Sequence, residues 1–397
     1  MRIFISTGEV SGDLQGSLLI AALKRQAAAA NLELEIVALG GEKMLEAGAT
    51  LLGNTSSIGS MGILESLPYI LPTIKVQRQA IAYLKQNPPD LVVLIDYMGP
   101  NIGIGTYMQQ HLPGVPIVYY IAPQEWVWAV NVRNTARIVS FTDKLLAIFP
   151  EEARYFRGKG AKVSWVGHPL VDRMQDAPSR QEARAKLGIA PEQTAIALLP
   201  ASRRQELKYL LPVIFQAAQT IQAKLPEVHF WIPLSLDIYR QPIEQAIERY
   251  GLRATVVSGQ QKKQVFAAVD FAITKSGTVN LELALLNVPQ VVVYRLHPIT
   301  VWIARKILKG SIPFASPPNL VVMKQIVPEF LQEQATPENI TQAVMELLLN
   351  PERRQQTLAD YKEMRQCLGE VGVCDRAAQE ILQMLPKTRD WGLGIGH

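Results

Sequence analysis

The sequence predicts an α/β protein built from two doubly wound, Rossmann-like domains, and two observations lead to this prediction. Short runs rich in Val, Ile, Leu and Phe alternate with helical stretches along most of the chain, which is typical of a parallel sheet covered by helices on both faces. The alternation occurs twice, once on each side of a polar stretch that carries Pro178 and Pro191. With 397 residues, of which 48% are hydrophobic, the chain can bury two cores.

The first half of the chain predicts one doubly wound unit. Helices are expected between its strands, for example over residues 13–29. The predicted strands lie near residues 2–6, 34–39, 91–95, 115–121, 144–148 and 162–165.

The second half repeats the pattern. Its strands are predicted at about 194–199, 228–233, 254–257, 270–274 and 290–294. From Pro337 onward the chain is mostly helical, with helix starts marked by Pro337-Glu338 and Pro351-Glu352. The predicted divisions are a first domain over 1–172, a linker over 173–190, a second domain over 191–345, and C-terminal helices over 346–397 that pack back on the rest.

Charge and cysteine content restrict the function classes. The 40 Lys and Arg residues outnumber the 35 Asp and Glu residues, which gives a formal net charge of +5 and an isoelectric point near 9.0. This excess suits anionic substrates or an anionic membrane surface, and without a dense basic block it does not indicate a nucleic-acid partner. The two cysteines, Cys367 and Cys374, lack metal-ligand spacing, so we expect a reducing compartment and no bound metal.

No segment is expected to cross a membrane or to direct secretion. The uncharged stretch from Tyr97 to Gln124 is interrupted by four prolines and four glycines. The apolar start of the chain is cut short by Glu9 and Asp13. We therefore expect a cytoplasmic protein.

Neither of the standard phosphate-binding motifs is complete. The sequence has no G-x-x-x-x-G-K-[ST], and Gly103 and Gly105 lack the third glycine of G-x-G-x-x-G. Three other loops follow a predicted strand and precede a predicted helix. Because doubly wound sheets bind ligands at the carboxyl ends of their strands, we expect the site at these loops, between the two domains.

In the first domain the candidate catalytic groups are acidic. Glu9 and Asp13 lie in the loop Gly8-Glu9-Val10-Ser11-Gly12-Asp13, which is either part of a site or a tight turn with a helix-capping residue. Asp96 follows the apolar strand over 91–95 and is either a general base or a capping acid. If Asp96 is not the base, Glu9 and Asp13 are the next candidates. His168 is either a hydrogen-bonding residue or a substrate contact.

In the second domain one loop suits a diphosphate. The segment Leu199–Glu206 contains Ser202, Arg203 and Glu206. An arginine at a helix start adds a bidentate donor to the free backbone N–H groups. The alternative is that Arg203 is an ordinary surface residue.

The other loop of the second domain is Lys275-Ser276-Gly277-Thr278, which opens the helix that carries Glu282. Backbone N–H groups of this turn can hold phosphate oxygens. Glu282 lies four residues after Thr278, on the same helix face, where its carboxylate could accept both hydroxyls of a ribose. The alternative is that Glu282 is a solvated helix residue.

Taken together, these segments resemble the lipid-A-disaccharide synthase family, two-domain glycosyltransferases of GT-B fold. The resemblance runs nearly from end to end. Its motifs are Gly8-Glu9-Val10-Ser11-Gly12-Asp13, Gly40-Gly41 with Met44, Met61-Gly62-Ile63-Leu64-Glu65, Ile95-Asp96, Trp126-Val127-Trp128, Phe149-Pro150, Gly167-His168-Pro169, Ser202-Arg203 with Glu206, Ser276-Gly277-Thr278 with Glu282, and Pro318-Asn319-Leu320.

The resemblance implies transfer of 2,3-diacylglucosamine from its UDP conjugate to 2,3-diacylglucosamine 1-phosphate. The products are lipid A disaccharide 1-phosphate and UDP, formed with inversion, without a metal or other cofactor, at the cytoplasmic face of the membrane. It implies that the first domain binds the acceptor, with Asp96 as the base, and that the second binds the donor. The residues it places on the UDP side are Ser202, Arg203, Glu206, Ser276, Gly277, Thr278, Glu282, Asn319 and Gln332.

The sequence departs from the family pattern mainly in the first domain. Gly99 stands where the family commonly has a second Asp, Ala201 precedes Ser202-Arg203, and Gln124-Glu125 replaces a Ser-x pair before Trp126. Two other functions therefore stay open. One is an isomerase that resembles UDP-N-acetylglucosamine epimerase, and the other is a non-catalytic relative that binds lipid or sugar nucleotide.

We also expect peripheral attachment to an anionic membrane surface. Two copies of the chain could form a homodimer. Residues 298–314 predict an amphipathic helix with Arg305, Lys306 and Lys309 around an apolar face. Residues 58–72 are almost wholly apolar, with Glu65 as their one charged residue. The alternative is that both segments are ordinary core helices.

Overall fold

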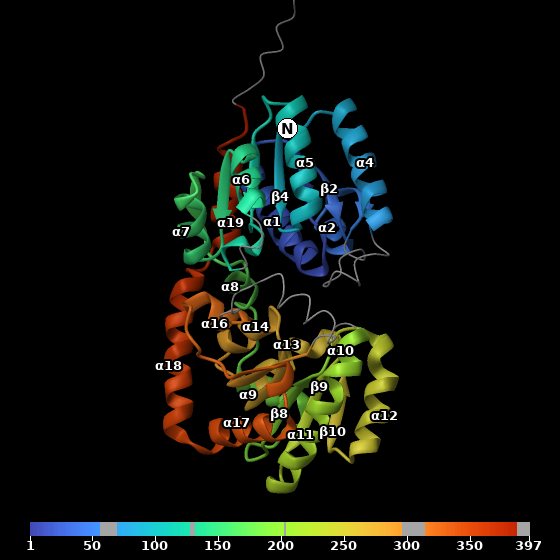
Figure 1. Ribbon diagram of the computed structural model, residues 1–397, viewed down its shortest axis with the longest axis vertical. Helices are drawn as coiled ribbons and strands as arrows, with labels where there is room; N and C mark the ends of the chain where they lie inside the picture. Colours follow the sequence, from blue (N-terminus) through green and yellow to red (C-terminus); the bar gives the residue numbers. More distant parts are fainter. Residues whose placement is uncertain (56–69, 128–131, 202–203, 296–313, 387–397) are drawn as a thin grey trace, which may run out of the picture. The chain divides into compact units, whose positions relative to one another are not determined.

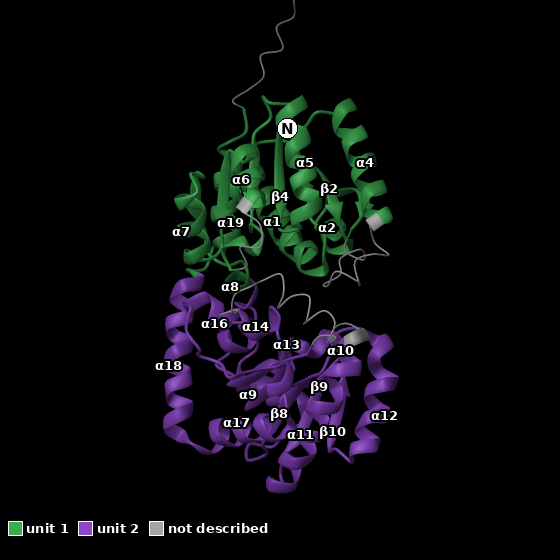
Figure 2. Ribbon diagram, in the orientation of Figure 1, with its two compact units in different colours: residues 1–172, 369–397 green, residues 173–368 purple. Residues whose placement is uncertain are grey.

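A computed structural model describes residues 1–55, 70–127, 132–201, 204–295 and 314–386. The predicted segments 58–72 and 298–314 therefore lie largely outside the described residues. The chain forms two compact units (Figures 1 and 2), in which unit 1 comprises Met1–Asp172 and Gly369–His397, and unit 2 comprises Arg173–Leu368. Each unit is an α/β unit with one sheet, so the predicted fold class of two Rossmann-like domains is confirmed.

Unit 1 contains a seven-stranded parallel sheet in the order β3-β2-β1-β4-β5-β6-β7. All five residues of the central strand β4 are buried, as expected for a parallel strand covered on both faces. The strands are β1 (Arg2–Ser6), β2 (Glu35–Gly40), β3 (Thr50–Asn54), β4 (Leu91–Ile95), β5 (Ile117–Tyr120), β6 (Lys144–Ala147) and β7 (Val163–Trp165).

Helices flank this sheet (Figure 1) and bury its aliphatic and aromatic side chains. They are α1 (Val10–Ala29), α2 (Glu42–Glu46), α4 (Ile70–Gln86), α5 (Met98–His111), α6 (Val132–Phe141), α7 (Pro150–Gly158), α8 (Leu170–Arg173), whose last residue belongs to unit 2, and α19 (Val373–Leu382), with a 3₁₀ turn η2 (Gln124–Trp126).

Unit 2 contains a six-stranded parallel sheet in the order β10-β9-β8-β11-β12-β13. Its strands are β8 (Ala195–Leu199), β9 (His229–Pro233), β10 (Ala254–Val257), β11 (Phe271–Lys275), β12 (Gln290–Tyr294) and β13 (Glu329–Leu331). Its helices are α9 (Arg180–Leu187), α10 (Arg204–Tyr209), α11 (Leu211–Lys224), α12 (Arg240–Tyr250), α13 (Lys262–Ala268), α14 (Val279–Leu285), α16 (Pro317–Val322), α17 (Pro337–Leu349) and α18 (Pro351–Leu368), with 3₁₀ turns η3 (Asp237–Tyr239), η4 (Gly259–Gln261) and η5 (Gln332–Gln334).

Strand order reverses once in each sheet, between β1 and β4 in unit 1 and between β8 and β11 in unit 2. In doubly wound sheets the ligand crevice lies at the carboxyl ends of the two strands that flank such a reversal. The loops after β1 and β4 carry Glu9 and Asp96, and the loop after β11 carries Ser276. The topology thus marks the loops that the sequence singles out.

The predicted linker over 173–190 is part of unit 2 and is wrong as a linker. Its polar residues cap and anchor a helix. Ser179 caps α9 by accepting a hydrogen bond from the Glu182 N–H, and α9 packs on α13. Arg180 and Arg184 both form ion pairs with Asp270, at 2.6 and 3.3 Å.

The C-terminal segment over 346–397 is divided between the units, because α18 belongs to unit 2 and α19 to unit 1, where α19 packs on α1. Gly372 directly precedes α19 as its N-cap residue, with a φ of +89° and no side chain to cap the helix. Asp172 takes this role: its carboxylate accepts hydrogen bonds from the N–H groups of Gly372, Val373 and Cys374, at 2.7–3.1 Å. This contact fixes the returning C-terminal helix to unit 1.

We expect Asp172→Ala to loosen the start of α19, because a lost helix cap costs about 0.5–2 kcal/mol. Hydrogen exchange followed by mass spectrometry should show faster exchange of the amides at residues 372–375 and little change in unit 2. Asp176→Ala, which removes a nearby exposed carboxylate, is the control and should leave the exchange unchanged. Equal protection of α19 in Asp172→Ala and the wild type would contradict the capping role.

Candidate functional site

In unit 1 the candidate site is formed by the two loops at the strand-order reversal. Glu9 follows β1 and Asp96 follows β4, and these strands pair through Ser6 and Leu94 close to both loops. Asp96 is half-buried. Burial and, to a smaller extent, the nearby Glu9 carboxylate raise the pKa of Asp96 to about 7.

The backbone at Asp96 adopts an uncommon conformation. Asp96 and Tyr97 are consecutive left-handed residues, with φ of +45° and +50°. The Asp96 N–H donates to the Ile121 carbonyl at 2.9 Å, and the Asp96 carbonyl accepts from Asn101 Nδ2 and from the Tyr119 hydroxyl, both at 2.8 Å. These three hydrogen bonds hold a conformation that an unsupported loop would leave.

Asn101 is fully buried and joins the two loops. Its Oδ1 accepts from Ser6 Oγ at 2.7 Å, and its Nδ2 also lies 3.0 Å from the Ile95 carbonyl. The ends of β1 and β4 therefore share one buried amide.

Gly8 makes room for Tyr97. A Cβ atom at Gly8 would lie 2.2 Å from the Tyr97 ring, so any larger residue would displace the ring. Tyr97 also forms a side-chain hydrogen bond with Thr73, at the start of α4. The glycine of the first predicted motif thus serves packing beside Asp96.

Asp13 has a structural role, and its assignment as a candidate catalytic group stays a prediction that this role disfavours. Its carboxylate accepts hydrogen bonds from the N–H groups of Gly41, Lys43 and Met44, at 2.8–3.2 Å, and so caps the short helix α2. The side chain is buried. The capping alternative was therefore the correct interpretation, although the capped helix is α2.

Two further acids and a histidine lie at the carboxyl ends of β5, β6 and β7. Glu152 is buried, accepts from the N–H groups of Ala122, Ile148 and Phe149, and has a pKa raised to about 7 by burial. Glu125, which lies where the sequence departs from the family pattern, is buried and accepts a hydrogen bond from Thr135 Oγ1.

The structure favours a structural role for His168. Its Nδ1 accepts the Leu170 N–H at 3.1 Å, and burial lowers its pKa to about 4, so the ring is neutral near pH 7. The ring also packs against Phe149. The hydrogen-bonding alternative is therefore the better supported one.

In unit 2, Glu206 and Lys275 connect the two loops at the strand-order reversal. Glu206 lies in α10 after β8, and Lys275 is the last residue of β11. Their Oε1 and Nζ atoms are 3.4 Å apart. Ser202 and Arg203 lie outside the described residues, so their assignment stays a prediction.

Glu282 is buried, so the alternative of a solvated residue is wrong. Its two carboxylate oxygens pair with Arg173 NH1 and Lys262 Nζ, each at 2.8 Å. A ribose at this carboxylate would therefore bind beside two cations. The ribose contact itself stays a prediction.

The loop after β11 offers fewer free backbone donors than predicted. The Gly277 N–H donates to Asn280 Oδ1 at 2.8 Å, and Ser276 Oγ donates to the Ala315 carbonyl at 2.6 Å. Thr278 precedes α14 as its N-terminal flanking residue. A phosphate at this turn would need a further cationic group.

Asn319 has a structural role, and its placement on the UDP side stays a prediction that this role disfavours. Its Oδ1 accepts from the N–H groups of Ile326 and Val327, and its Nδ2 donates to the Val327 carbonyl and to Glu329. The side chain is fully buried, so these bonds use its whole amide.

Gln332 follows β13 with a φ of +51°, and its carbonyl accepts from Arg295 Nε at 3.2 Å. The strands are parallel, so Gln332 and Lys275 both lie at the carboxyl ends of their strands. Strand β12 separates β13 from β11, so Gln332 lies farther from the strand-order reversal than Lys275.

Sequence reasoning missed three residues that build these loops. The motif Lys275-Ser276-Gly277-Thr278 contains Lys275 but assigns it no role of its own. A charged residue at the end of a buried strand could have marked it as a site candidate. Asn101 and Glu152 act through partners that are far away in sequence or that lie on other strands, and no local pattern marks them.

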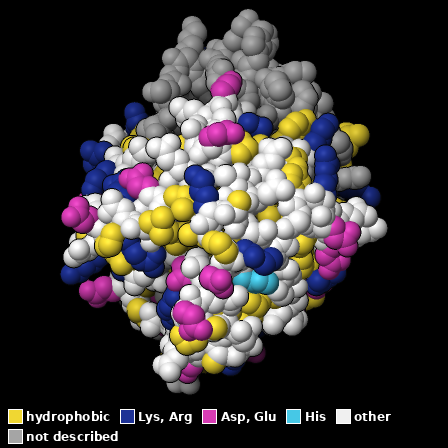
Figure 3. All heavy atoms as spheres, turned by 90° about the horizontal axis from the view of Figure 1, so that it is seen from below, with side chains coloured by type: hydrophobic (Ala, Val, Ile, Leu, Met, Phe, Trp, Pro, Cys, Tyr) yellow, Lys and Arg dark blue, Asp and Glu magenta, His cyan; other side chains and the backbone are white. Residues whose placement is uncertain are grey.

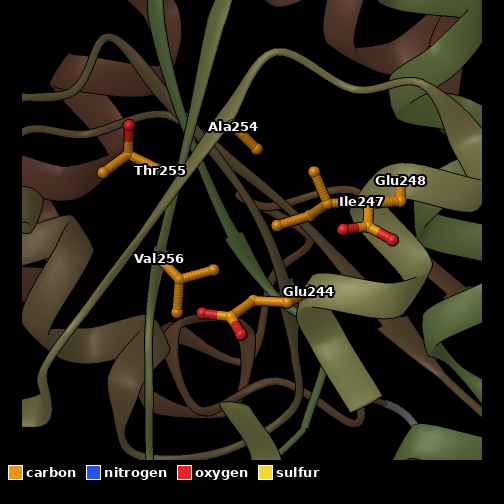
Figure 4. A pocket seen from close by; sticks show the side chains of 6 residues that line it. All are labelled: Glu244, Ile247, Glu248, Ala254, Thr255 and Val256. Atoms are coloured by element: carbon orange, nitrogen blue, oxygen red, sulfur yellow. The ribbon is translucent and has the colours of Figure 1, made fainter. Parts of the chain in front are cut away.

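A surface hollow lies elsewhere in unit 2, between α12 and the edge strand β10 (Figure 4). Glu244 and Glu248 line it together with Ile247, which points from α12 toward the strand. Two carboxylates without a lining cation do not suit a diphosphate. The hollow is therefore not the candidate site.

The chain matches a known protein family over nearly its whole length. The family model described as Lipid-A-disaccharide synthetase matches residues 3–384. The chain is 65% identical over 382 residues to a lipid-A-disaccharide synthase from Gloeothece citriformis, a match that covers 96% of this chain and 99% of the relative. It is 58% identical over 384 residues to the one from Synechocystis sp., with 96% and 98% covered.

Among solved structures, the chain resembles UDP-GlcNAc 2-epimerase from Neisseria meningitidis bound to UDP-GlcNAc, with a TM-score of 0.68, 13% identity, and coverage of 96% of this chain and 100% of the other. It also resembles the glycotransferase of kitacinnamycin, with a TM-score of 0.61, 16% identity, and coverage of 97% and 99%. At this identity the likeness concerns the fold alone.

The raised pKa of Asp96 predicts a pH-dependent stability difference. A carboxyl group whose pKa is higher in the folded state than in the unfolded state stabilises the protein while it is protonated. For Asp96 this stabilisation is lost as the pH rises from 3.8, the ordinary pKa of an Asp, to about 7. Asp96→Asn removes the ionisation. The melting temperature of the variant relative to the wild type should therefore rise through this window and stay constant above it.

Glu152 and His168 titrate in both proteins, so their own contributions largely cancel, and the charge of Asp96 is only the smallest cause of the raised pKa of Glu152. Asp90→Asn, which removes a carboxylate at the opposite end of β4, is the matched control with which the trend of Asp96→Asn is compared. A constant difference in melting temperature between Asp96→Asn and the wild type from about pH 4 to 8 would contradict the shift.

Proposed function

The chain belongs to the lipid-A-disaccharide synthase family, glycosyltransferases of lipid A biosynthesis, and we propose from this premise that it transfers 2,3-diacylglucosamine from its UDP conjugate to 2,3-diacylglucosamine 1-phosphate. The products are lipid A disaccharide 1-phosphate and UDP. The observation that carries the proposal is 65% identity over 96% of the chain. The Gly99 departure leaves this membership unchanged.

Asp96 is the proposed general base. Its carboxylate takes the proton of the acceptor hydroxyl while the oxygen attacks the anomeric carbon of the donor, and the bond from that carbon to the diphosphate breaks. One such displacement inverts the anomeric centre. A pKa of about 7 leaves the group both ionised and basic near neutral pH, which suits this task. Glu9 supports that pKa through its own charge.

Unit 2 is the proposed donor side. Arg203 would hold the diphosphate, Ser276 and Thr278 would line it, and Glu282 would accept the ribose hydroxyls between Arg173 and Lys262. Gln332 stays a proposed contact at the same sheet edge. Helix ends and cations can stabilise a leaving diphosphate, so the proposal requires no metal or other cofactor.

Acyl chains and a membrane surface are the proposed neighbours of Asp96. Helices α1, α4 and α5 expose large apolar side chains near their first residues, namely Val10, Leu71, Ile74 and Met98, with Leu71 77% exposed. Helix α5 follows Asp96 directly, and the Tyr97 bond to Thr73 brings the start of α4 to it. Exposed aliphatic groups beside a catalytic acid suit a diacylated sugar.

Helix α4 also carries exposed basic residues on the same face as its exposed apolar ones. Leu71, Ile74 and Arg78 follow one another at intervals of three and four residues, and Lys75 lies four residues after Leu71 and three before Arg78. In contrast, the face shown in Figure 3 mixes acidic and basic side chains. In the described part of the chain, no helix has the length and apolarity needed to span a bilayer. We therefore propose peripheral attachment through α4 at the cytoplasmic membrane face; the homodimer stays a prediction.

The transfer reaction tests the proposal. Incubation with both acylated sugars should release UDP and form the disaccharide, and Asp96→Asn should lower turnover by roughly 10²–10⁴-fold. The rate of the wild type should rise with pH up to about 7, where the base becomes ionised. Asp90→Asn is the control with unchanged turnover. Conversion of UDP-N-acetylglucosamine to an epimer would favour the isomerase alternative, and no reaction would favour a binding protein.

Vesicle co-sedimentation tests the membrane proposal. Wild-type protein should sediment with anionic vesicles at low salt and detach at high salt. Lys75→Gln with Arg78→Gln should lower the partition coefficient about 30-fold, because each basic residue near an anionic surface contributes about 1 kcal/mol. Lys85→Gln, at the other end of α4, should change it much less. Equal sedimentation of the double variant and the wild type would exclude α4 as the docking helix.

A further inference from the structure

We propose that Lys275 is a catalytic residue that binds the diphosphate of the UDP donor and stabilises its negative charge as it leaves, and that Glu206 positions the lysine. The inference rests on the proposed transferase function. It adds a residue to the donor side that the sequence motifs do not assign.

The position of Lys275 places a cation where this sheet binds ligands. Lys275 ends β11, which pairs with β8 at the strand-order reversal. Its side chain is only 14% exposed, and that of Glu206 only 9%. The Nζ atom lies 3.4 Å from Glu206 Oε1 and 3.4 Å from the Ser276 carbonyl oxygen. The ammonium group is thus held between α10 and the loop after β11.

The ammonium group also lies beside the predicted phosphate-binding turn. A Cβ atom at Gly277 would be 3.6 Å from Lys275 Nζ, so the absence of a side chain at Gly277 keeps the approach to the ammonium open. The Gly277 N–H already donates to Asn280 Oδ1. Because the backbone donor of this glycine is occupied, Lys275 supplies the positive group that a phosphate needs at this turn.

The ion pair is poorly explained by stability alone. A charge pair at such low exposure loses much of its Coulomb energy to desolvation, and apolar residues of similar size often serve a core equally well. A carboxylate that holds a lysine next to a glycine turn does have a catalytic use. It keeps the ammonium oriented before the donor arrives, which lowers the reorganisation required in the transition state.

The chemistry assigns Lys275 to the leaving group. Asp96 accepts the proton of the acceptor hydroxyl, the acceptor oxygen forms the new bond to the anomeric carbon, and the electron pair of the broken bond moves to the β-phosphate oxygen of UDP. Lys275 keeps its proton throughout and interacts most strongly with the oxygen whose negative charge increases. This differential interaction raises turnover as well as affinity.

The experiment compares ligands that differ only in the diphosphate. Titration calorimetry should show that Lys275→Met weakens UDP binding at least tenfold and leaves uridine binding unchanged, and turnover should fall by about 10²–10³-fold. The double variant Glu206→Gln with Lys275→Met removes both charges of this ion pair, so neither is left without the other, and it should show the same defects. Lys324→Met, which breaks the lysine pair with Asp360, is the matched control with normal UDP affinity.

The possible results separate this inference from the proposed function. A double variant that binds UDP and turns over like the wild type would overturn the role of Lys275 while the transferase function stands. Equal losses for UDP and uridine would assign Lys275 a structural role and also overturn the inference. A wild type that neither binds UDP nor catalyses transfer would overturn the proposed function first and this inference with it.

Discussion

Each sheet of this protein is constrained by the right-handed crossover that joins parallel strands. In each sheet the first strand along the chain lies in the middle of the strand order. Connections that build the sheet to one side of this strand place their helices on one face, and connections that build it to the other side place them on the opposite face. At the reversal between β1 and β4, and again between β8 and β11, two neighbouring loops therefore leave the sheet in opposite directions. Doubly wound sheets bind ligands at such reversals, and Glu9, Asp96 and Ser276 lie on the loops there.

The loop at Asp96 shows how the fold supports an unfavourable local structure. Two left-handed residues and a half-buried carboxyl group both cost free energy. Asn101 and the Tyr119 hydroxyl offset part of that cost by fixing the Asp96 carbonyl, and the absence of a side chain at Gly8 accommodates the Tyr97 ring. The buried apolar strand β4, which directly precedes Asp96, anchors the start of the loop. The same burial that makes the site costly also raises the pKa into the range in which a base is useful.

Local patterns predicted most of the fold but less of the site. The buried strands, such as β4 and β11, are continuous apolar runs, and the starts of α17 and α18 carry Pro-Glu pairs, so both are visible in sequence. Strands β3 and β13 were missed; β13 has only three residues, and β3 contains a glycine and ends on an asparagine.

The structural roles of Asp13 and Asn319 escaped the sequence patterns for one shared reason. Asp13 and Asn319 resemble site residues because they are polar and follow a strand or begin a helix. Their partners lie on other segments: Asp13 caps α2, about 30 residues on, and Asn319 joins α16 to the turn before β13. The linker error at 173–190 is similar, since the charges of α9 pair with Asp270, more than 80 residues away. Periodicity and motifs report neighbours along the chain and contain no record of such contacts.

The two units share an architecture but differ in charge at the equivalent place. At the reversal in unit 1, burial and the nearby Glu9 carboxylate disfavour ionisation of Asp96, whereas the reversal in unit 2 carries Lys275 held by Glu206. An acid with a raised pKa can accept a proton, and a held cation can stabilise a leaving anion. The proposed inverting transfer uses both operations, one at each end of the displacement. A repeated architecture can carry two such different functional groups, because the side chains at a strand-order reversal can change without altering the sheet that positions them.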